Sequence, residues 1–178
     1  MQEKTITILF DPDNFLRSRK NIWSFSNKKF VKIHAIFGAW AIILFIISLS
    51  TKDQSSFAFG IISGYLFYVL LRWFGFYERR VKFLNKSRNY AKRFEKEAMA
   101  CTFTFSENEI EYQDKEKLYK LSWSLFKPYI IFKDSIFLIA KDSSTIVFTI
   151  NRAEVDNENY SEICDILKDK IGFDKVAR

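Results

Sequence analysis

The residues of this chain that could take part in acid–base chemistry are few. Three glutamates, Glu107, Glu109 and Glu111, alternate along a short segment, and paired carboxylates are a common device for general acid–base catalysis. Glu109 and Glu111 flank Ile110, so in a strand both would lie on the face opposite the Ile110 side chain. That pattern is typical of a solvated strand face, and we expect no catalytic carboxylate pair here.

The chain also has few residues that could bind a metal or act as a nucleophile. The chain has one histidine, His34, and two isolated cysteines, Cys101 and Cys164, without CxxC spacing, so neither a His/Cys zinc site nor a nucleophile–base–orienter set can be drawn. His34 could act as a pH switch, but its place beside an apolar run favours an interfacial polar residue. Four of the five glycines lie within residues 33–76, which leaves no Gly-rich phosphate loop. We expect no catalytic residue, no metal and no cofactor.

The main feature of the 178-residue chain is a pair of long apolar runs, residues 33–49 and 57–76, separated by a short polar loop. A helix needs about 20 mostly apolar residues to cross a bilayer, and both runs meet this length. The ten strong apolar residues of the first run favour insertion by roughly 3 to 6 kcal/mol. We predict a transmembrane helical hairpin, with a buried hairpin in a soluble core as the alternative.

Basic residues crowd the outer flanks of both runs. Residues 1–32 hold seven Lys or Arg and residues 72–96 hold nine, whereas the connecting loop holds only Lys52. The positive-inside rule therefore places both termini in the cytoplasm and the loop outside. The second run contains one charge, Arg72, near its end, where a long side chain can snorkel to the interface. We expect contacts with anionic lipid headgroups from Arg72, Arg79, Arg80, Lys28, Lys29 and Lys32.

The net charge of +7 is unevenly distributed. Residues 1–98 contain 17 basic and 7 acidic residues, a net charge of +10, and residues 99–178 contain 11 basic and 14 acidic residues, a net charge of −3. The positive charge thus lies next to the apolar runs, where it sets topology and attracts anionic lipid rather than nucleic acid. The expected partners are membrane lipids, together with a protein partner or a second copy of the chain.

The pattern divides the chain into four segments. They are an N-terminal strand and basic juxtamembrane helix (1–32), the transmembrane hairpin (33–76), a basic cytoplasmic helix that extends the second span (77–98), and a cytoplasmic domain (99–178). In the first segment, Thr5 to Phe10 alternates Thr and Ile as a strand does, and Asp11-Pro12-Asp13 can cap a helix. The mixed basic and aromatic segment that follows, residues 15–33, suits either an interfacial amphipathic helix or a plain linker helix.

From Met99 onward the apolar period becomes two, which indicates strands separated by polar turns. The expected strands cover residues 99–105, 109–113, 118–123, 129–132, 136–140 and 145–150. An amphipathic helix over residues 158–171 follows them. The fold class is therefore a membrane α+β protein: a two-helix hairpin, then a small antiparallel sheet of about six strands closed by a C-terminal helix.

Small residues in the second run, Gly60 and Gly64, form a GxxxG pattern. In a tight hairpin, partner residues should have numbers that sum to roughly 106, which sets Gly60 near Ile46 and Gly64 near Ile42. Bulky side chains would then fill the space beside each glycine. We predict that these glycines serve helix packing within the hairpin, with a dimer face as the alternative.

This layout resembles the YcxB-like family of bacterial membrane proteins over nearly the whole chain. The resemblance is carried by the opening TITILFDPDNF, the two spans, the basic helix, and FTFSENEIEY, LYKLSWSLF, FLIA and IVFTINRAEV in the tail. Trp123 stands where that family tends to carry a tryptophan, whereas Asn151-Arg152 stands where the family commonly has a proline and a basic residue. The resemblance implies a bacterial inner-membrane protein with a pleckstrin-homology-like (PH-like) tail, and it implies no activity.

Taken together, the sequence predicts a non-enzymatic integral membrane protein that presents a PH-like interaction domain at the inner face of the membrane. Trp123, Tyr129 and Arg152 are the residues expected to meet a partner. The alternative is an accessory subunit of a larger membrane transporter or enzyme complex. A membrane enzyme is the least favoured option, because the residues that carry chemistry form no constellation.

Overall fold

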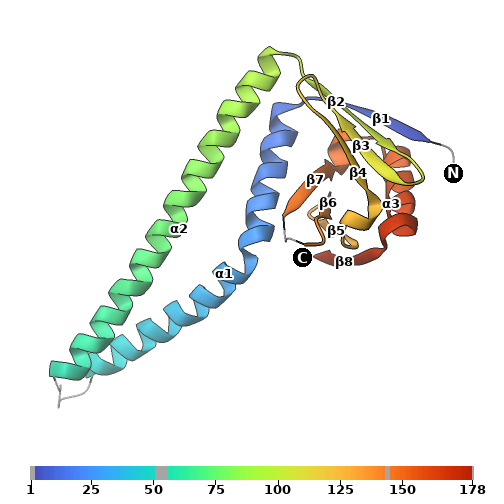
Figure 1. Cartoon of the computed structure of the whole chain (residues 1–178). Coiled ribbons are helices and arrows are strands. Elements are labelled where there is room, and N and C mark those ends of the chain that lie inside the picture. The colour runs from blue at the N-terminus through green and yellow to red at the C-terminus, as the bar shows by residue number, and fades with distance from the viewer. Residues whose placement is uncertain (1–2, 51–55, 143–144, 178) are drawn as a thin grey trace. The chain divides into compact units, whose positions relative to one another are not determined.

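The computed structural model describes residues 3–50, 56–142 and 145–177 (Figure 1). The predicted loop between the apolar runs, with Lys52, falls on residues 51–55 and lies outside this part. The chain forms two compact units. One is a helical unit, Trp23–Asn85, and the other is a sheet unit made of Met1–Ile22 and Lys86–Arg178.

Two long helices, α1 (Pro12–Ser50) and α2 (Ser56–Lys96), contribute to both units. They contain the predicted spans and also the flanking helices predicted before and after them, without interruption. Asp11 caps α1 as predicted, since its Oδ1 accepts the backbone N–H of Asp13 and of Asn14 at 2.8 and 3.0 Å. Both helices are long and apolar enough to cross a membrane.

Aromatic pairs hold the helical unit together. The ring centroids lie 5.2 Å apart for Trp23 and Phe83, 4.8 Å for Phe30 and Phe76, and 5.9 Å for Phe45 and Phe59. These pairs follow the predicted hairpin pairing, in which partner numbers sum to roughly 106.

The predicted packing role of Gly60 and Gly64 is wrong for the hairpin. A Cβ added to either glycine would have no neighbour within 4 Å, so neither glycine allows a close approach of α1. Gly38 faces α2 instead: an added Cβ there would be in ordinary van der Waals contact, 3.8 Å from Val69 Cγ1 and 3.9 Å from Trp73 Nε1. Residue pairing was predicted well, but the rotation of each helix about its axis decides which face meets the partner.

Among its described residues, the sheet unit has eight strands in two sheets rather than one sheet of about six. The first sheet has the antiparallel order β1-β2-β3-β4, and the second has the order β7-β6-β5-β8, with β8 parallel to β5. The strands are β1 (Lys4–Leu9), β2 (Ala100–Phe105), β3 (Glu109–Gln113), β4 (Leu118–Ser122), β5 (Tyr129–Phe132), β6 (Ser135–Ile139), β7 (Ile146–Asn151) and β8 (Phe173–Ala177). The six strands predicted for the tail match β2 to β7, and the predicted C-terminal helix is α3 (Asn157–Ile171).

The first strand belongs to this unit and not to a separate N-terminal segment. β1 pairs with β2 over six residues, from Lys4 opposite Phe105 to Leu9 opposite Ala100. The alternating threonines of β1 face those of β2, with Thr5 and Thr104 Oγ1 atoms 3.3 Å apart. Because the two strands are separated by the whole helical unit, no local pattern could reveal their pairing.

Both sheets and α3 share one core. Its fully buried residues come from the first sheet, the second sheet and the helix: Phe105, Ile110, Ile136, Leu138, Ile150, Ile163 and Leu167. The first turns of α1 join this unit through a hydrogen bond from Asn21 Nδ2 to Ser135 Oγ, 3.3 Å long and buried. After α3, Gly172 adopts a φ of +76°, which a residue with a Cβ rarely adopts, and the chain turns there into β8.

Candidate functional site

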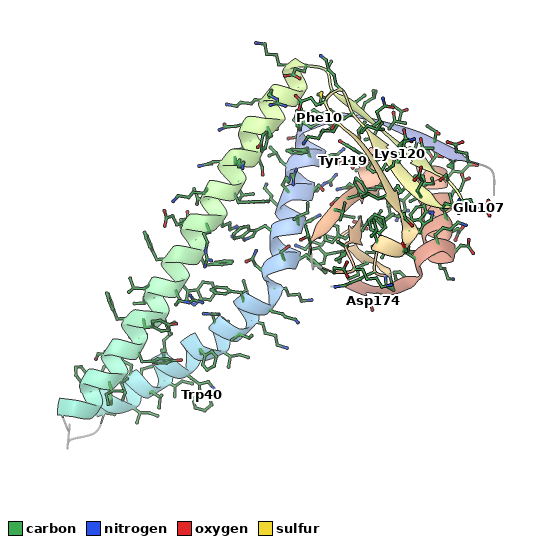
Figure 2. The ribbon with its side chains drawn as sticks, viewed as in Figure 1. Phe10, Trp40, Glu107, Tyr119, Lys120 and Asp174 are labelled. Carbon is green, nitrogen blue, oxygen red and sulfur yellow. The ribbon has the colours of Figure 1, made fainter. Side chains whose placement is uncertain are left out.

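The sheet unit contains a cavity of about 390 Å³. Its walls come from the end of β1, the first turns of α1, the last turn of α2, and the strands β2, β3, β4 and β7. Phe10 and Tyr119, both marked in Figure 2, are among the aromatic residues that line it. Leu9, Tyr119 and Val147 are exposed lining residues, so the cavity opens to solvent. Its volume falls in the range typical of small-molecule sites, roughly 300 to 1,000 Å³.

Arg19 of α1 brings a positive charge to this wall. Its guanidinium carbon lies 4.9 Å from the centre of the Phe15 ring, a cation–π contact within one turn of the helix. Burial lowers the pKa of Arg19, although a guanidinium stays charged at physiological pH. In the part of the chain that the structure describes, this guanidinium has no hydrogen bond and no ion pair.

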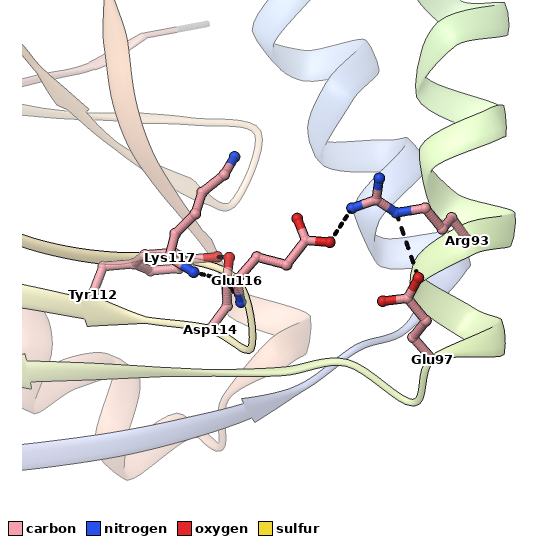
Figure 3. Close-up of polar contacts among 6 residues, drawn as sticks. All are labelled: Arg93, Glu97, Tyr112, Asp114, Glu116 and Lys117. Carbon is pink, nitrogen blue, oxygen red and sulfur yellow. Dashed lines mark hydrogen bonds and ion pairs between the residues drawn. The ribbon is translucent and has the colours of Figure 1, made fainter.

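The turn between β3 and β4 supplies a tyrosine and a carboxylate. Tyr112 donates its hydroxyl hydrogen to Asp114 Oδ2 at 2.8 Å, and Asp114 Oδ1 accepts the backbone N–H of Glu116 and of Lys117, both at 2.7 Å (Figure 3). Burial raises the pKa of Tyr112, and the hydrogen bond to Asp114 raises it further. Burial alone would raise the pKa of Asp114, but the bonds that it accepts outweigh burial and lower it. Asp114 is therefore an ionised, hydrogen-bonded turn residue.

An ion pair connects this turn to the last turns of α2. Arg93 lies between Glu116 of the turn and Glu97, which directly follows α2 (Figure 3). Its Nη2 forms an ion pair with Glu116, and its Nε lies 3.6 Å from Glu97 Oε1. Arg93 also lies over Phe94, whose ring forms part of the cavity wall. The Arg93–Glu116 ion pair thus connects two parts of the cavity wall, the end of α2 and the turn between β3 and β4.

Cys101 and Glu154 complete the polar lining. Burial raises the pKa of Cys101 to about 12, with smaller contributions from Glu154 and Asp114. Burial also raises the pKa of Glu154, whose Oε2 accepts the backbone N–H of Asn151 at 3.0 Å. A protonated thiol is a poor nucleophile, and the described residues contain no group of three or more His, Cys, Asp or Glu that could hold a metal ion.

Two of the three residues predicted to meet a partner lie in the interior. Trp123 is 7% exposed and donates its Nε1–H to the carbonyl of Ser106 at 3.1 Å, and Tyr129 is 4% exposed and donates its hydroxyl to the carbonyl of Cys164 at 3.3 Å. Burial of this kind is structural, and a partner cannot reach these side chains in this fold. The prediction failed because Trp and Tyr carry large apolar surfaces that favour burial, with the polar atom hydrogen-bonded inside.

The third predicted residue, Arg152, is exposed. Its Nε and Nη2 both donate to Asn157 Oδ1, at 3.2 and 3.1 Å, and its guanidinium lies 5.7 Å from the centre of the Tyr160 ring. These contacts tie the end of β7 to the first turn of α3. Arg152 is therefore held in place next to the helix.

The residues predicted to contact lipid headgroups are all exposed, in agreement with a solvated or lipid-facing position: Lys28, Lys29, Lys32, Arg72, Arg79 and Arg80. Arg72 lies over the Phe30 ring at 5.7 Å, and His34 Nδ1 lies 3.0 Å from the Phe30 carbonyl oxygen. His34 is thus engaged by its own helix.

The alternating glutamates lie on the solvated face of β3 and in the turn before it. Glu111 pairs with Lys120 across the strands, and Glu107 is exposed (Figure 2). Ile110, between Glu109 and Glu111, is fully buried, so the predicted alternation is confirmed.

Comparisons with protein-family models, with curated proteins and with solved structures find no match to this chain. The YcxB-like and PH-like assignments therefore stay predictions.

The sequence did not point to the cavity. Arg19 is one of seven basic residues in residues 1–32, and composition alone does not distinguish it from Arg17 or Lys20. The one signal in the sequence is its spacing of four residues from Phe15, on the helical face that also carries Ile22.

Proposed function

We propose that this protein is a non-enzymatic integral membrane protein of a bacterial inner membrane. In this proposal the α1–α2 hairpin is the anchor, both termini are cytoplasmic, and the sheet unit is a PH-like binding module presented at the inner face. The layout that resembles the YcxB-like family supports this assignment, as does the clustering of basic residues beside both spans.

The observation that carries the proposal is the exposure of the apolar stretches of α1 and α2. Only 6% and 11% of the residues in their most apolar 18-residue stretches are buried, whereas the core helix of a soluble protein is mostly buried. Trp40, for instance, is 58% exposed and projects from α1 (Figure 2). So much exposed apolar surface is stable in lipid and strongly unfavourable in water.

Cysteine labelling in intact cells tests both the anchor and its orientation. Ser50→Cys, at the end of α1, and Ser161→Cys, on the exposed face of α3, are each made in a chain that also carries Cys101→Ser and Cys164→Ser. We expect a membrane-impermeant maleimide to label Ser50→Cys in intact cells and Ser161→Cys only after permeabilisation. The converse pattern, or full-length chain in a detergent-free soluble fraction, contradicts the proposal.

The accessory-subunit alternative makes a different prediction for the same material. A pull-down in mild detergent should then recover one membrane partner in stoichiometric amount. Recovery of the chain alone, or with lipid only, supports the self-sufficient binding module instead.

A further inference from the structure

Among the described lining residues, Arg19 is the one cation on the α1 side of the cavity, and its environment is unusual for an arginine. Half-buried charged groups in proteins are normally paired with a carboxylate or hydrogen-bonded, because removing a charge from water is costly. Within residues 3–50, 56–142 and 145–177, the Arg19 guanidinium packs on the face of Phe15 and lies near Tyr90 and Tyr112, which partly offset the effect of burial on its pKa, but it has no hydrogen bond and no ion pair. A cation–π contact offsets part of the desolvation cost and leaves the five N–H donors available.

The carboxylates that share the cavity are each engaged elsewhere. Asp11 accepts two backbone N–H groups at the start of α1, Asp114 accepts Tyr112 and two backbone N–H groups, and Glu154 accepts the backbone N–H of Asn151. Each carboxylate therefore stabilises a turn or a helix end. None of them neutralises Arg19.

The rest of the wall is mainly apolar and aromatic. Phe94, Met99, Phe103 and Phe148 contribute to it, and all but Phe94 are buried. A second cation, Lys117, lies on the exposed part of the lining. An apolar wall next to a guanidinium with free donors suits a ligand with a negative head and an apolar body.

We propose that this cavity binds an amphipathic anion, a carboxylate or phosphate joined to an apolar chain, and that Arg19 is its anion receptor. The guanidinium donates two parallel hydrogen bonds to the head, as arginine does with carboxylates and phosphates. The aromatic walls cover the chain. This site lies wholly within the sheet unit and does not depend on membrane anchoring.

The test uses the full chain in a neutral detergent, with radiolabelled octyl phosphate in equilibrium dialysis. Octanol and octyltrimethylammonium carry the same chain with no charge and with a positive charge. We expect saturable binding of octyl phosphate, and at least about tenfold weaker binding of the other two, because a charge-assisted hydrogen bond is worth about 1.5–3 kcal/mol.

Variants then assign the head group to its receptor. Arg19→Gln should weaken octyl phosphate binding by about tenfold or more and leave octanol binding unchanged, and Arg19→Lys should be intermediate. Lys20→Gln is the matched control, since it removes one exposed charge from the same helix outside the cavity, and it should bind as the wild type does.

A measurement on the unmodified chain keeps the test independent of how the variants fold. Octyl phosphate should shift the side-chain methyl signals of Ile22 and Met99, which line the cavity, in nuclear magnetic resonance spectra, and leave that of Ile163 of α3 unaffected. Equal affinity for octyl phosphate and octanol, unchanged affinity in a folded Arg19→Gln variant, or unshifted Ile22 and Met99 signals would each overturn the proposal.

A final arm separates two sources of the ligand. The chain is placed in phosphatidylcholine nanodiscs with and without added phosphatidate. If phosphatidate competes with octyl phosphate, the bilayer supplies the amphipathic anion; if it does not, the ligand is a soluble one.

Discussion

Glu154 shows how one side chain can have two roles in this fold. Its Oε2 accepts the N–H of Asn151, whose Oδ1 accepts the N–H of Ala153, so the two side chains cap a short 3-10 helix (Arg152–Glu154) reciprocally. The same carboxyl lines the cavity, and its burial raises its pKa above the ordinary value of 4.5. The hydrogen bond lowers the pKa again in part, as does Arg17.

Replacement by Gln separates these roles. Because folding raises the pKa of Glu154, the folded state binds this proton more tightly than the unfolded state, and stability falls as the pH rises above 4.5. Glu154→Gln keeps an acceptor for Asn151 and removes the titration. We expect the melting temperature of the variant to depend less on pH between about 4 and 7 and to exceed the wild-type value at about pH 7. Glu107→Gln, on an exposed turn, is the control; a lower melting temperature for Glu154→Gln throughout would show that the charge is stabilising.

At the scale of the elements, the contact between α1 and α2 depends on which small residue faces the partner helix. Gly38 lies in van der Waals reach of Val69 and Trp73, whereas Gly60 and Gly64 face open space. Pattern alone favoured Gly60 and Gly64, because GxxxG is a frequent sign of close helix packing. Gly38, which belongs to no GxxxG pattern, is the glycine at which an added Cβ would contact the partner helix.

Two matched substitutions test this difference. The Cβ of Gly38→Leu would already contact Val69 and Trp73, so the rest of the leucine side chain has to push these residues aside, and we expect it to lower the free energy of unfolding of the helical unit by about 1–3 kcal/mol. The Cβ of Gly64→Leu would have no neighbour within 4 Å, so this variant should be neutral or slightly stabilising, because leucine has the higher helix propensity. Thermal unfolding in neutral detergent, followed by the fluorescence of the tryptophans, provides the measurement. Equal losses in both variants would argue against this helix rotation.

At the scale of the whole molecule, the sheet unit is assembled from two chain segments that lie on either side of the helical unit in the sequence. Ile6 and Ile8 of β1 belong to its core, and β1 provides a full antiparallel partner for β2. Without β1, β2 would pair only with β3, and its other edge would be exposed next to an incomplete core. The segment that the sequence marked as a domain, residues 99–178, therefore lacks part of its own fold.

This incompleteness is measurable on fragments. We expect residues 99–178 alone to aggregate or to unfold without cooperativity, and residues 86–178 joined through a flexible linker to residues 3–22 to fold. The dispersion of amide signals in nuclear magnetic resonance spectra distinguishes the two outcomes. A well-dispersed spectrum and a cooperative transition for residues 99–178 alone would show that β1 is dispensable.

Much of the fold could be predicted because its signals are local. Strands β2, β3, β4 and β7 largely alternate apolar and polar residues, β5 and β6 are short apolar runs between polar turns, and α3 carries a helical apolar stripe, so each element is visible within a short window. β8 was missed because its five residues, Phe173–Ala177, hold too few alternating apolar positions to stand out. The candidate site was missed altogether, since Arg19, Glu154 and Tyr112 lie on three distant segments and only their packing brings them to one cavity.

The sequence by itself determined most of the elements, the apolar hairpin and the placement of positive charge, because these depend on hydrophobic period and local composition. The tertiary structure decided the pairing of β1 with β2, the division of the strands into two sheets, the helix faces that meet, and the cavity with its unpaired Arg19. Each of these is a contact between residues far apart in the chain. Such contacts depend on the complementary shape and charge of surfaces that no sequence window contains.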